Sequence, residues 1–483
     1  MLDLRSYPFK TKPYDHQRKA LEMGAEREAY AYFMEMGTGK SKVTVDSAAV
    51  LYDLGKIEAV VVIAPKGVYK NWPNKELPDH LPEHIIPRVA VWESSLSKKV
   101  RESIDAIFQP TPAVLDFFFL NVDAVNTSKG KYILEKFLTE RKCLMVVDES
   151  TIIKNEGAKR TKEIIRLGQF AAYRRILTGS PITKGPLDLY AQCAFLGRDL
   201  LGFRNFYAFR NRYAILQPVN LGGRTFQKVV GFKNEEELKD KLQEFSYRVT
   251  KDECLDLPEK IYQTRDVELT KEQLKVYDEM KRKAIAEIEA QGRASASIVL
   301  TQLLRLQQIT CGHLKMDDGT IVDIPSKRLN ELMDILEEVD GKAIIWANYR
   351  RDIQALHDAI AQAYGAGSVV TYFGDTTQHE REEAIRAFQA EQSDVRFFIA
   401  NQSTGGYGIT LTAANTVIYY SNGYDLEKRL QSEDRAHRIG QKHPVVYIDL
   451  IARGTVDEKI IDALRKKNDI ARLITGDEWK EWI

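Results

Sequence analysis

Short runs of apolar residues, each bounded by turn-forming residues, recur along the chain and are separated by stretches with helical periodicity. The six clearest runs are AVVVIAP (59–65), CLMVVDE (143–149), RRILTGS (174–180), KAIIWAN (342–348), RFFIAN (396–401) and TVIYYSN (416–422). Runs that are apolar at successive positions are typical of strands buried on both faces of a parallel sheet. Their alternation with helical patterns occurs twice, so the sequence predicts an α/β fold with two lobes.

The two sets of strand-like runs are separated by a region, from about residue 190 to 325, in which strand patterns become rare. Amphipathic helical stretches dominate there, including 269–290 and 296–310. At 483 residues the chain is too long for a single core. We therefore expect a first lobe at 1–200, a helical insertion or linker region at 201–325, and a second lobe at 326–483.

The overall charge is balanced, with 70 Lys and Arg residues against 69 Asp and Glu residues. Affinity for nucleic acid must therefore come from local patches. Each candidate patch, taken alone, is best interpreted as solvated surface. The candidates are Lys98 with Lys99, Arg174 with Arg175, Lys281 to Lys283, Arg350 with Arg351, and Arg465 to Lys467.

The four cysteines lie far apart in the sequence, so neither a zinc site nor a disulfide framework is indicated. The N-terminal residues have no apolar core typical of a signal peptide, and no apolar run is long enough to span a bilayer. We expect no membrane partner and a cytoplasmic protein, or a nuclear one if the host has a nucleus.

A glycine-rich turn stands in the stretch FMEMGTGKSKVTVDSAAVL, where a strand would pass into a helix. Its residues Gly37, Thr38, Gly39, Lys40 and Ser41 form a short GxGKS pattern. Such a turn lets backbone N–H groups surround phosphate, while the lysine reaches the β- and γ-phosphates and the hydroxyl ligates Mg²⁺. The full P-loop pattern would have glycine where this chain has Met34, so an ordinary glycine turn stays open as the alternative.

Two adjacent carboxylates, Asp148 and Glu149, end the apolar run CLMVVDE. A buried strand does not readily tolerate such a pair unless charged groups meet it. Asp148 would hold the water shell of Mg²⁺, and Glu149 would orient or deprotonate the attacking water. Following a GxGKS pattern, the pair predicts a Walker-type nucleoside triphosphatase site that uses Mg²⁺.

The stretch QSEDRAHRIGQ (431–441) carries a third group of polar residues. If the stretch is helical, Gln431, Arg435 and Arg438 lie at i, i+4 and i+7 and leave one face together. A solvated charged face is one interpretation. The other is that an arginine from the second lobe supplies positive charge to the γ-phosphate, with the nucleotide in a cleft between the lobes.

The order of YDHQRKAL, MGTGKS, VVDES, LTGSP, STGGYGITLTAAN and QSEDRAHRIGQ resembles the superfamily-two nucleic-acid motors. Three stretches resemble the Swi/Snf-like branch of double-stranded-DNA translocases in particular: IIKN (152–155), 247–280 with its LPEK segment, and DRAHRIGQ (434–441). The resemblance covers nearly the whole chain and is to a compact, single-motor form. It implies two RecA-like parallel-sheet lobes with helical insertions between them.

The resemblance also implies roles for single residues. Gln17 would read the adenine edge, Lys40 and Ser41 would hold phosphate and Mg²⁺, and Asp148 and Glu149 would keep the roles given above. Gln431, Arg435 and Arg438 would complete the γ-phosphate shell. The further candidates are Thr178 and Ser180, which would link nucleotide state to the nucleic acid; Gly406, Gly408 and Thr410 near the cleft and the tracked strand; and Lys66 and Asn121 as phosphate-backbone contacts.

Two positions depart from the family pattern. Thr151 stands where a histidine usually follows the acidic pair, and Lys184 stands where an asparagine usually follows the LTGTP-type motif. The hydrogen bond that such a histidine makes to the second lobe is therefore in doubt.

The expected function is an ATP-dependent motor that translocates on duplex DNA without base-specific readout. A strand-separating helicase of DNA or RNA, which would need a wedge element, and a nucleotide-gated DNA clamp are the alternatives. The sequence identifies no protein partner.

Overall fold

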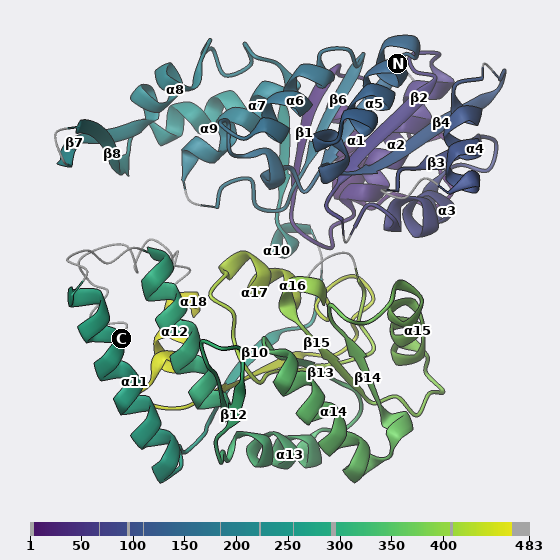
Figure 1. The fold of residues 1–483 in the computed structure, drawn as a ribbon. Helices are drawn as coiled ribbons and strands as arrows, with labels where there is room; N and C mark the ends of the chain where they lie inside the picture. Colours follow the sequence, from purple (N-terminus) through teal and green to yellow (C-terminus); the bar gives the residue numbers. More distant parts are fainter. Residues whose placement is uncertain are drawn as a thin grey trace. The chain divides into compact units, whose positions relative to one another are not determined.

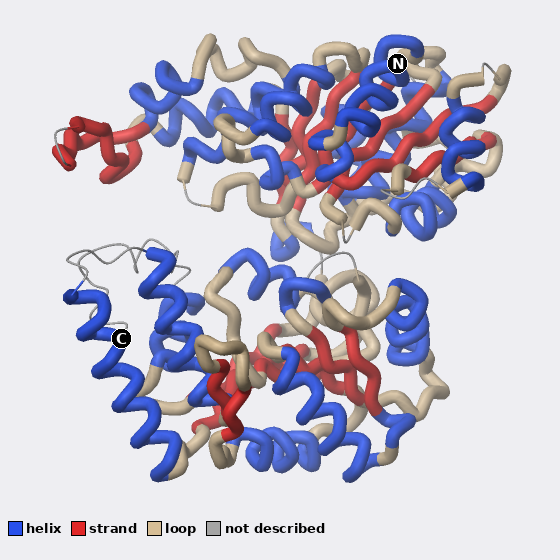
Figure 2. Tube along the Cα trace, viewed as in Figure 1, coloured by secondary structure: helices blue, strands red, loops and turns tan. Residues whose placement is uncertain are grey.

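The computed structural model describes residues 4–66, 68–93, 97–109, 111–183, 185–221, 224–254, 256–290, 296–405 and 409–465. The chain divides into two compact units, Met1–Asp256 and Leu257–Ile483, and Figures 1 and 2 show the elements of each. No helix within the described ranges has both the length and the apolar character needed to cross a membrane.

Unit 1 is built on a seven-stranded sheet in the order β3-β4-β2-β5-β6-β1-β9. All neighbouring strands are parallel, with Val62 of β2 opposite Phe119 of β4 on one side and Val146 of β5 on the other. The strands are β1 (Ala29–Met34), β2 (Ala59–Ala64), β3 (Ile86–Val91), β4 (Val114–Asn121), β5 (Cys143–Asp148), β6 (Tyr173–Leu177) and β9 (Ser246–Val249).

Helices cover both faces of this sheet, because successive residues of each buried strand point to opposite sides. One core contains Val61 and Ile63 and packs against α4, α5, α6 and α7; the other contains Val60 and Val62 and packs against α1, α2 and α3. The α-helices of unit 1 are α1 (Asp15–Gly24), α2 (Lys40–Asp53), α3 (Leu77–His80), α4 (Lys98–Ile107), α5 (Ser128–Glu140), α6 (Lys159–Gly168), α7 (Leu189–Leu196), α8 (Phe206–Tyr213), α9 (Glu235–Gln243) and α10 (Lys251–Cys254). Single turns η1 (Trp72–Glu76), η2 (Val122–Asn126), η3 (Ser150–Ile153) and η4 (Pro186–Asp188) connect them.

Unit 2 repeats this plan with a six-stranded sheet in the order β10-β17-β16-β13-β15-β14. Its strands are β10 (Lys260–Asp266), β13 (Ala343–Trp346), β14 (Val369–Tyr372), β15 (Phe397–Ala400), β16 (Thr416–Tyr419) and β17 (Val445–Ile451), all parallel to their neighbours. Its helices are α11 (Lys271–Ala290), α12 (Ala296–Cys311), α13 (Arg328–Glu338), α14 (Arg350–Tyr364), α15 (Gln378–Gln389), α16 (Gln402–Gly405), α17 (Leu426–Glu433) and α18 (Val456–Arg465), with a single turn η5 (Ala366–Ser368). The predicted two-lobed α/β architecture is therefore confirmed.

Region 201–325 contains strands that the hydrophobic pattern did not predict. β7 (Ala214–Leu221) and β8 (Arg224–Phe232) form an antiparallel hairpin, and β11 (His313–Lys315) pairs with β12 (Ile321–Asp323). β9 completes the edge of the first sheet and β10 completes the edge of the second. The division between the units, after Asp256, falls inside this region. The three ranges predicted from the sequence stay a prediction.

Candidate functional site

The loop between β1 and α2 has the backbone shape that its glycines predict. Gly37 and Gly39 have φ angles of 82° and 92°, a left-handed conformation that residues with a Cβ rarely adopt. A Cβ on Gly39 would also lie only 2.2 Å from Nε2 of Gln17. The loop therefore brings the first residue of α2, the largely buried Lys40, and the half-buried Ser41 to the carboxyl end of the sheet.

Gln17 of α1 holds this loop from the side. Its Nε2 donates to the carbonyl oxygen of Thr38 at 3.0 Å, and the Nε2 of His16 lies 2.8 Å from the same oxygen. The buried Thr38 hydroxyl donates to the carbonyl of Glu35 at 2.7 Å. The structure thus places Gln17, Gly37, Thr38, Gly39 and Lys40 in one cluster.

Asp148 lies at the end of β5, two strands from β1 in the same sheet. Because parallel strands share one carboxyl edge, the carboxylate and the glycine loop lie at the same edge. The Asp148 carboxylate is buried, and it accepts hydrogen bonds from Nε1 of Trp72 and from the backbone N–H of Glu149, each at 2.9 Å. Burial raises the pKa of Asp148, and the Trp72 hydrogen bond and the charge of Lys40 oppose the rise only in part.

Glu149 has a φ of 47° and a ψ of 60°, which is the left-handed region. For a residue other than glycine this conformation costs about 1–3 kcal/mol and persists only where the surroundings impose it. The half-buried residue lies directly after Asp148, the carboxylate whose pKa the charge of Lys40 lowers. Backbone strain of this kind concentrates at active sites.

Two hydrogen-bonded links tie the acidic loop to the LTGSP loop. Buried Ser150 donates to Oε1 of buried Gln192 at 2.7 Å, and Nε2 of Gln192 donates to the carbonyl of Pro181 at 2.8 Å. Nζ of Lys154 donates to the Thr183 hydroxyl at 2.5 Å. Sequence reasoning missed Gln192, Ser150 and Trp72. For Gln192 the available signal is a polar residue inside the apolar stretch LYAQCAF, which is buried along its length except at Tyr190.

The LTGSP loop itself lies against the glycine loop. A Cβ on Gly179 would lie 3.0 Å from the backbone nitrogen of Met36, which is tighter than ordinary contacts. Buried Thr178 accepts from the backbone N–H of Ser180 at 3.2 Å. Thr151, where the family usually has histidine, is buried beside these links. All of these contacts lie within unit 1.

The stretch QSEDRAHRIGQ is not helical along its whole length. α17 ends at Glu433, and turns follow, so Gln431, Arg435 and Arg438 do not share one helix face. Gln431 is 0% exposed and Arg435 is 6% exposed, so the interpretation as a solvated charged face is wrong.

The chain instead folds back on the segment after residue 408. Nη1 of Arg435 and Nη1 of Arg438 both reach the carbonyl oxygen of Ile409, at 3.1 and 3.4 Å, and Nε of Arg435 donates to the carbonyl of Gln431 at 2.8 Å. The half-buried Thr410 follows directly. The structure therefore brings Arg435, Arg438 and the segment at Ile409 together within unit 2. Gly406 and Gly408 of unit 2 and Lys184 of unit 1 lie outside the described residues.

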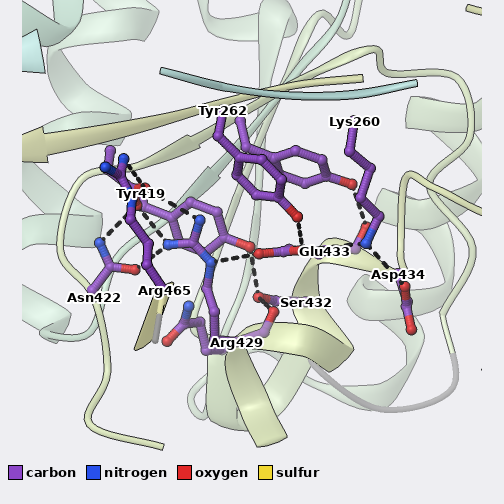
Figure 3. A network of polar contacts seen from close by, with 12 residues as sticks. Lys260, Tyr262, Tyr419, Asn422, Arg429, Ser432, Glu433, Asp434 and Arg465 are labelled. Carbon is purple, nitrogen blue, oxygen red and sulfur yellow. Dashed lines mark hydrogen bonds and ion pairs between the residues drawn. The ribbon is translucent and has the colours of Figure 1, made fainter. Parts of the chain in front are cut away.

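A buried polar network fixes α17 in this position (Figure 3). Arg429 binds Asp449 of β17 at 2.5 Å and Glu433 at 2.9 Å, and its guanidinium lies 3.5 Å from the ring centre of Tyr419. Burial alone would lower the pKa of Arg429, but the two carboxylates raise it above its usual value. Glu433 also accepts from the Tyr262 hydroxyl at 2.8 Å and pairs with Lys260 at 3.2 Å. Burial would raise the pKa of Glu433, yet Arg429 and Lys260 hold it below its usual range.

The LPEK segment is thus bound to the stretch that carries the arginines. Lys260 lies 3.7 Å from Asp434, and Nε2 of His437 lies 2.7 Å from the carbonyl oxygen of Pro258. Two of the stretches that carried the family resemblance, far apart in sequence, are neighbours in unit 2.

The basic patches identified in the sequence differ in their burial and in their partners. Arg175 is wholly buried and donates to the carbonyls of Gly24 and Ala25 at 2.8 and 2.9 Å, so its assignment to solvated surface is wrong. Arg350 and Arg351 pair with Asp375 and Asp323 at 2.9 and 2.7 Å. Of the Arg465 to Lys467 patch, only Arg465 lies within the described residues.

The weaker candidates for DNA contact lie at two strand ends of unit 1. Lys66 is exposed after β2, while Asn121, at the end of β4, caps the following turn by accepting from the backbone N–H of Ala124 at 3.1 Å. Asn121 also lines a pocket of about 410 Å³. The other lining residues are Trp92, Arg101, Asp123, Ala124, Thr127 and Lys129.

Comparison with known proteins shows the family to which this chain belongs. Residues 16–315 match the model of the SNF2-related domain, and residues 327–440 match that of the helicase conserved C-terminal domain. An uncharacterized ATP-dependent helicase of Mycoplasma genitalium is 26% identical over 91% of this chain and 39% of its own length. The human SWI/SNF-related matrix-associated actin-dependent regulator of chromatin subfamily A member 1 is 29% identical over 89% of this chain and 40% of its own.

The chain thus spans about two fifths of the length of these relatives. Among solved structures, the Sulfolobus solfataricus SWI2/SNF2 ATPase core in complex with dsDNA is similar, with a TM-score of 0.44 and 25% identity over 100% of this chain and 97% of that one. Since one family model matches more than half of the sequence and the second domain follows it, the resemblance is confirmed and the chain belongs to the SNF2-related family.

Proposed function

We propose that this protein is a motor that hydrolyses ATP to translocate along double-stranded DNA without reading base sequence. The observation that carries the proposal is the buried carboxylate of Asp148, near enough to Lys40 for that charge to lower the carboxyl pKa, at the edge of the sheet that also holds the glycine loop, in an SNF2-related chain. A loop of backbone N–H groups, a cation and a buried carboxylate together are what phosphoryl transfer requires.

The residues present fit ATP with Mg²⁺. Nucleotide sites hold Mg²⁺ through one or two carboxylates and the phosphates, and Asp148 with the Ser41 hydroxyl offers such a donor set. Bound Mg²⁺ would neutralise charge that develops on the phosphate oxygens. Lys40 would bind the β- and γ-phosphates, and Gly37, Thr38 and Gly39 would surround them with backbone N–H groups.

Glu149 would orient the attacking water and accept its proton, since it directly follows Asp148 and its backbone is held in a strained conformation. Gln17 would read the adenine edge. Its amide now binds the Thr38 carbonyl, so adenine binding and loop position would be linked.

Arg435 and Arg438 would act as arginine fingers on the γ-phosphate, with Gln431 completing the same shell, and Gly408 would contribute to nucleotide binding. The buried Oε1 of Gln431 has no hydrogen-bond partner among the described residues, which suits a group that awaits a ligand. Thr178 and Ser180 would transmit the nucleotide state to the DNA side, because their loop packs on the glycine loop.

DNA would be held through its phosphates. The pocket lined by Asn121, Arg101, Thr127 and Lys129 has the size and the donors to accept a backbone phosphate. Such contacts carry no sequence information, which fits a motor that must move along any duplex.

The test is ATP turnover measured without nucleic acid and then with single-stranded DNA, duplex DNA and duplex RNA. We expect the strongest stimulation by duplex DNA, and stimulation should fall as salt rises because phosphate contacts release counterions. Equal rates with all four conditions would overturn the proposal.

Two variants separate binding from chemistry in this assay. Lys40→Ala should weaken both ATP binding and turnover, because the charge that holds the phosphates is gone. Glu149→Gln should bind ATP yet leave it unhydrolysed, because only the base is removed. Lys56→Ala, in an exposed turn after α2, is the matched control and should leave both properties unchanged.

A strand-separating helicase is the second candidate, because the β7–β8 hairpin carries the exposed aromatic Phe226. A translocase should displace the third strand of a triplex without unwinding a tailed duplex. Unwinding without triplex displacement would favour the helicase.

A further inference from the structure

The segment that runs from α8 through the β7–β8 hairpin carries a charge unlike the rest of the molecule. Residues 200–233 contain no Asp or Glu and six cations: Arg204, Arg210, Arg212, Arg224, Lys228 and Lys233. The whole chain has a net charge of only +1. Because none of these cations is adjacent to another, a search for basic pairs in the sequence misses them.

We call residues 204–220 and 226–233 the basic arm. Figure 1 shows its hairpin at the end of unit 1, beyond α8 and away from the sheet. Among the described side chains of the hairpin, only Ala214 is buried. An isolated two-stranded hairpin is only marginally stable in water, so a surface that remains open on both faces calls for a partner.

The root of the basic arm is firmly anchored in unit 1. Buried Tyr213 donates to Oε1 of Glu237 at 2.9 Å, and the backbone N–H of Lys233 donates to the carbonyl of Tyr213 at 2.9 Å. The ring of Phe232 packs on Gly185, where a Cβ would lie 2.2 Å from the ring. A force on the hairpin would therefore be transmitted to the segment that follows the LTGSP loop.

Four cations of the basic arm form no ion pair with any residue in the described ranges: Arg204, Arg210, Lys228 and Lys233. By contrast, Arg212 at the root pairs with Glu237. Arg210 lies 5.2 Å from the ring centre of Tyr207, which is 66% exposed. The structure thus presents cations and an aromatic ring to solvent without carboxylates between them.

Beside exposed apolar side chains such as Ile215 and Phe226, the hairpin carries polar side chains that suit a polyanion. Lys228 lies opposite Gln217, and Gln227 lies opposite Pro218, so amides and a cation stand among the apolar residues of the hairpin. Lysine, arginine, glutamine and tyrosine are among the side chains that bind DNA phosphates. A two-stranded ribbon also has the width that a major groove admits.

We propose that the basic arm is a second DNA-binding surface, which grips the phosphate backbone of duplex DNA alongside the motor's own track. This inference rests on the proposed function. The partner is identified by charge complementarity, since an open, acid-free cationic ribbon in a nearly neutral protein suits a polyanion.

The test compares two full-length variants with equal loss of charge. The arm variant is Arg204→Gln with Lys228→Gln and Lys233→Gln. The control is Lys281→Gln with Arg282→Gln and Lys283→Gln on α11, where carboxylates such as Asp278, Glu279 and Glu287 lie among the cations. Binding to a labelled blunt duplex is titrated between about 50 and 200 mM salt.

Each lost phosphate contact reduces the slope of log affinity against log salt by about 0.9. The arm variant should therefore lose about 2–3 from this slope and bind the duplex at least about tenfold more weakly at low salt, whereas the control keeps the wild-type slope. The melting temperatures of all three proteins should agree, because the substituted side chains are exposed or half-buried.

As a second readout, duplex DNA should protect Lys228 and Lys233 of the wild-type protein from acetylation. An arm variant with the wild-type slope, together with no protection of these lysines, would overturn the inference and leave the arm as a docking surface for an acidic protein. If wild-type protein does not bind duplex DNA at all, the proposed function fails first, so the two failures are distinguishable.

Discussion

The two sheets place polar residues at their carboxyl ends by different means. In unit 1 the backbone does so: Gly37 and Gly39 take left-handed conformations, and Glu149 is strained next to Asp148. In unit 2 side chains do so, because Arg429 binds Glu433 and Asp449 and thereby fixes the helix before Arg435. A site built by local backbone shape depends on few neighbours, whereas a site built by a buried ionic network depends on residues far apart in sequence.

The largest expected effect is a loss of stability when the buried ionic network of unit 2 is broken. Arg429→Met should leave the buried carboxylates of Asp449 and Glu433 without their shared cation, at a cost of about 3–5 kcal/mol. Arg453→Met is the control, because that arginine is about half-exposed and pairs with Asp266 and Glu458, a kind of pair worth at most about 1 kcal/mol. Hydrogen exchange followed by mass spectrometry should show loss of amide protection in α17 and β17 only for Arg429→Met. Equal protection in both variants would mean that the network does not hold α17.

The next prediction concerns turnover. Arg438→Ala should lower the rate of ATP hydrolysis by about a thousandfold, as for other arginine fingers, while the affinity for an unhydrolysable ATP analogue changes far less. Arg438→Lys should not restore the rate, because lysine lacks the planar fork that binds phosphate oxygens. If Arg438→Lys were fully active, the half-buried Arg438 would have only a structural role and would not be an arginine finger.

How well the sequence predicted each part of the structure depends on the same difference between local backbone shape and contacts between residues far apart in sequence. The strand runs, the α/β class and the GxGKS loop depend on local composition, and all were predictable because buried parallel strands and left-handed glycines leave local marks. The hairpin was not predicted, because its strands mix apolar, amide and glycine residues without clear alternation. The path of QSEDRAHRIGQ was not predictable either, since α17 ends where contacts with Pro258, Lys260 and Ile409 take over.

The same reason explains why Gln192 and Trp72 were missed. Each reaches its partner across a long stretch of chain, with Trp72 bound to Asp148 and Gln192 bound to Ser150. The apolar stretch around Gln192 marks that residue as unusual, but nothing in the neighbouring residues identifies the partner of Gln192 or of Trp72. The catalytic and binding roles assigned from the motifs stay predictions, which the variants described here test.

A smaller effect is expected for the link between the acidic loop and the LTGSP loop. Gln192→Leu should leave the Pro181 carbonyl and the Ser150 hydroxyl without their buried partner, which costs about 1–3 kcal/mol. If the link also positions Glu149, kcat should fall while KM for ATP stays near the wild-type value. Gln169→Leu, an exposed glutamine after α6, is the control.

A double-mutant cycle with Ser150→Ala sharpens this prediction. The two substitutions should be non-additive by about 0.5–3 kcal/mol, because they remove one shared hydrogen bond. Additive effects would show that Ser150 and Gln192 act independently.

The smallest effect is a pH shift within unit 1. Burial raises the pKa of Asp148 above the usual value of about 3.9, and the hydrogen bond from Trp72 opposes that rise. Below the raised pKa the carboxyl is protonated and cannot serve as an anionic ligand, so the Mg²⁺-dependent part of ATP affinity should fall about tenfold for each pH unit below it. Trp72→Phe removes a cause that lowers the pKa, so the fall should begin at higher pH in that variant than in the wild type. Titrations of ATP affinity from neutral to acidic pH, with and without EDTA, measure this, and Asp148→Asn supplies the background from ATP itself. A midpoint that stays in place or moves to lower pH in Trp72→Phe would show that the indole does not hold the charged form of Asp148.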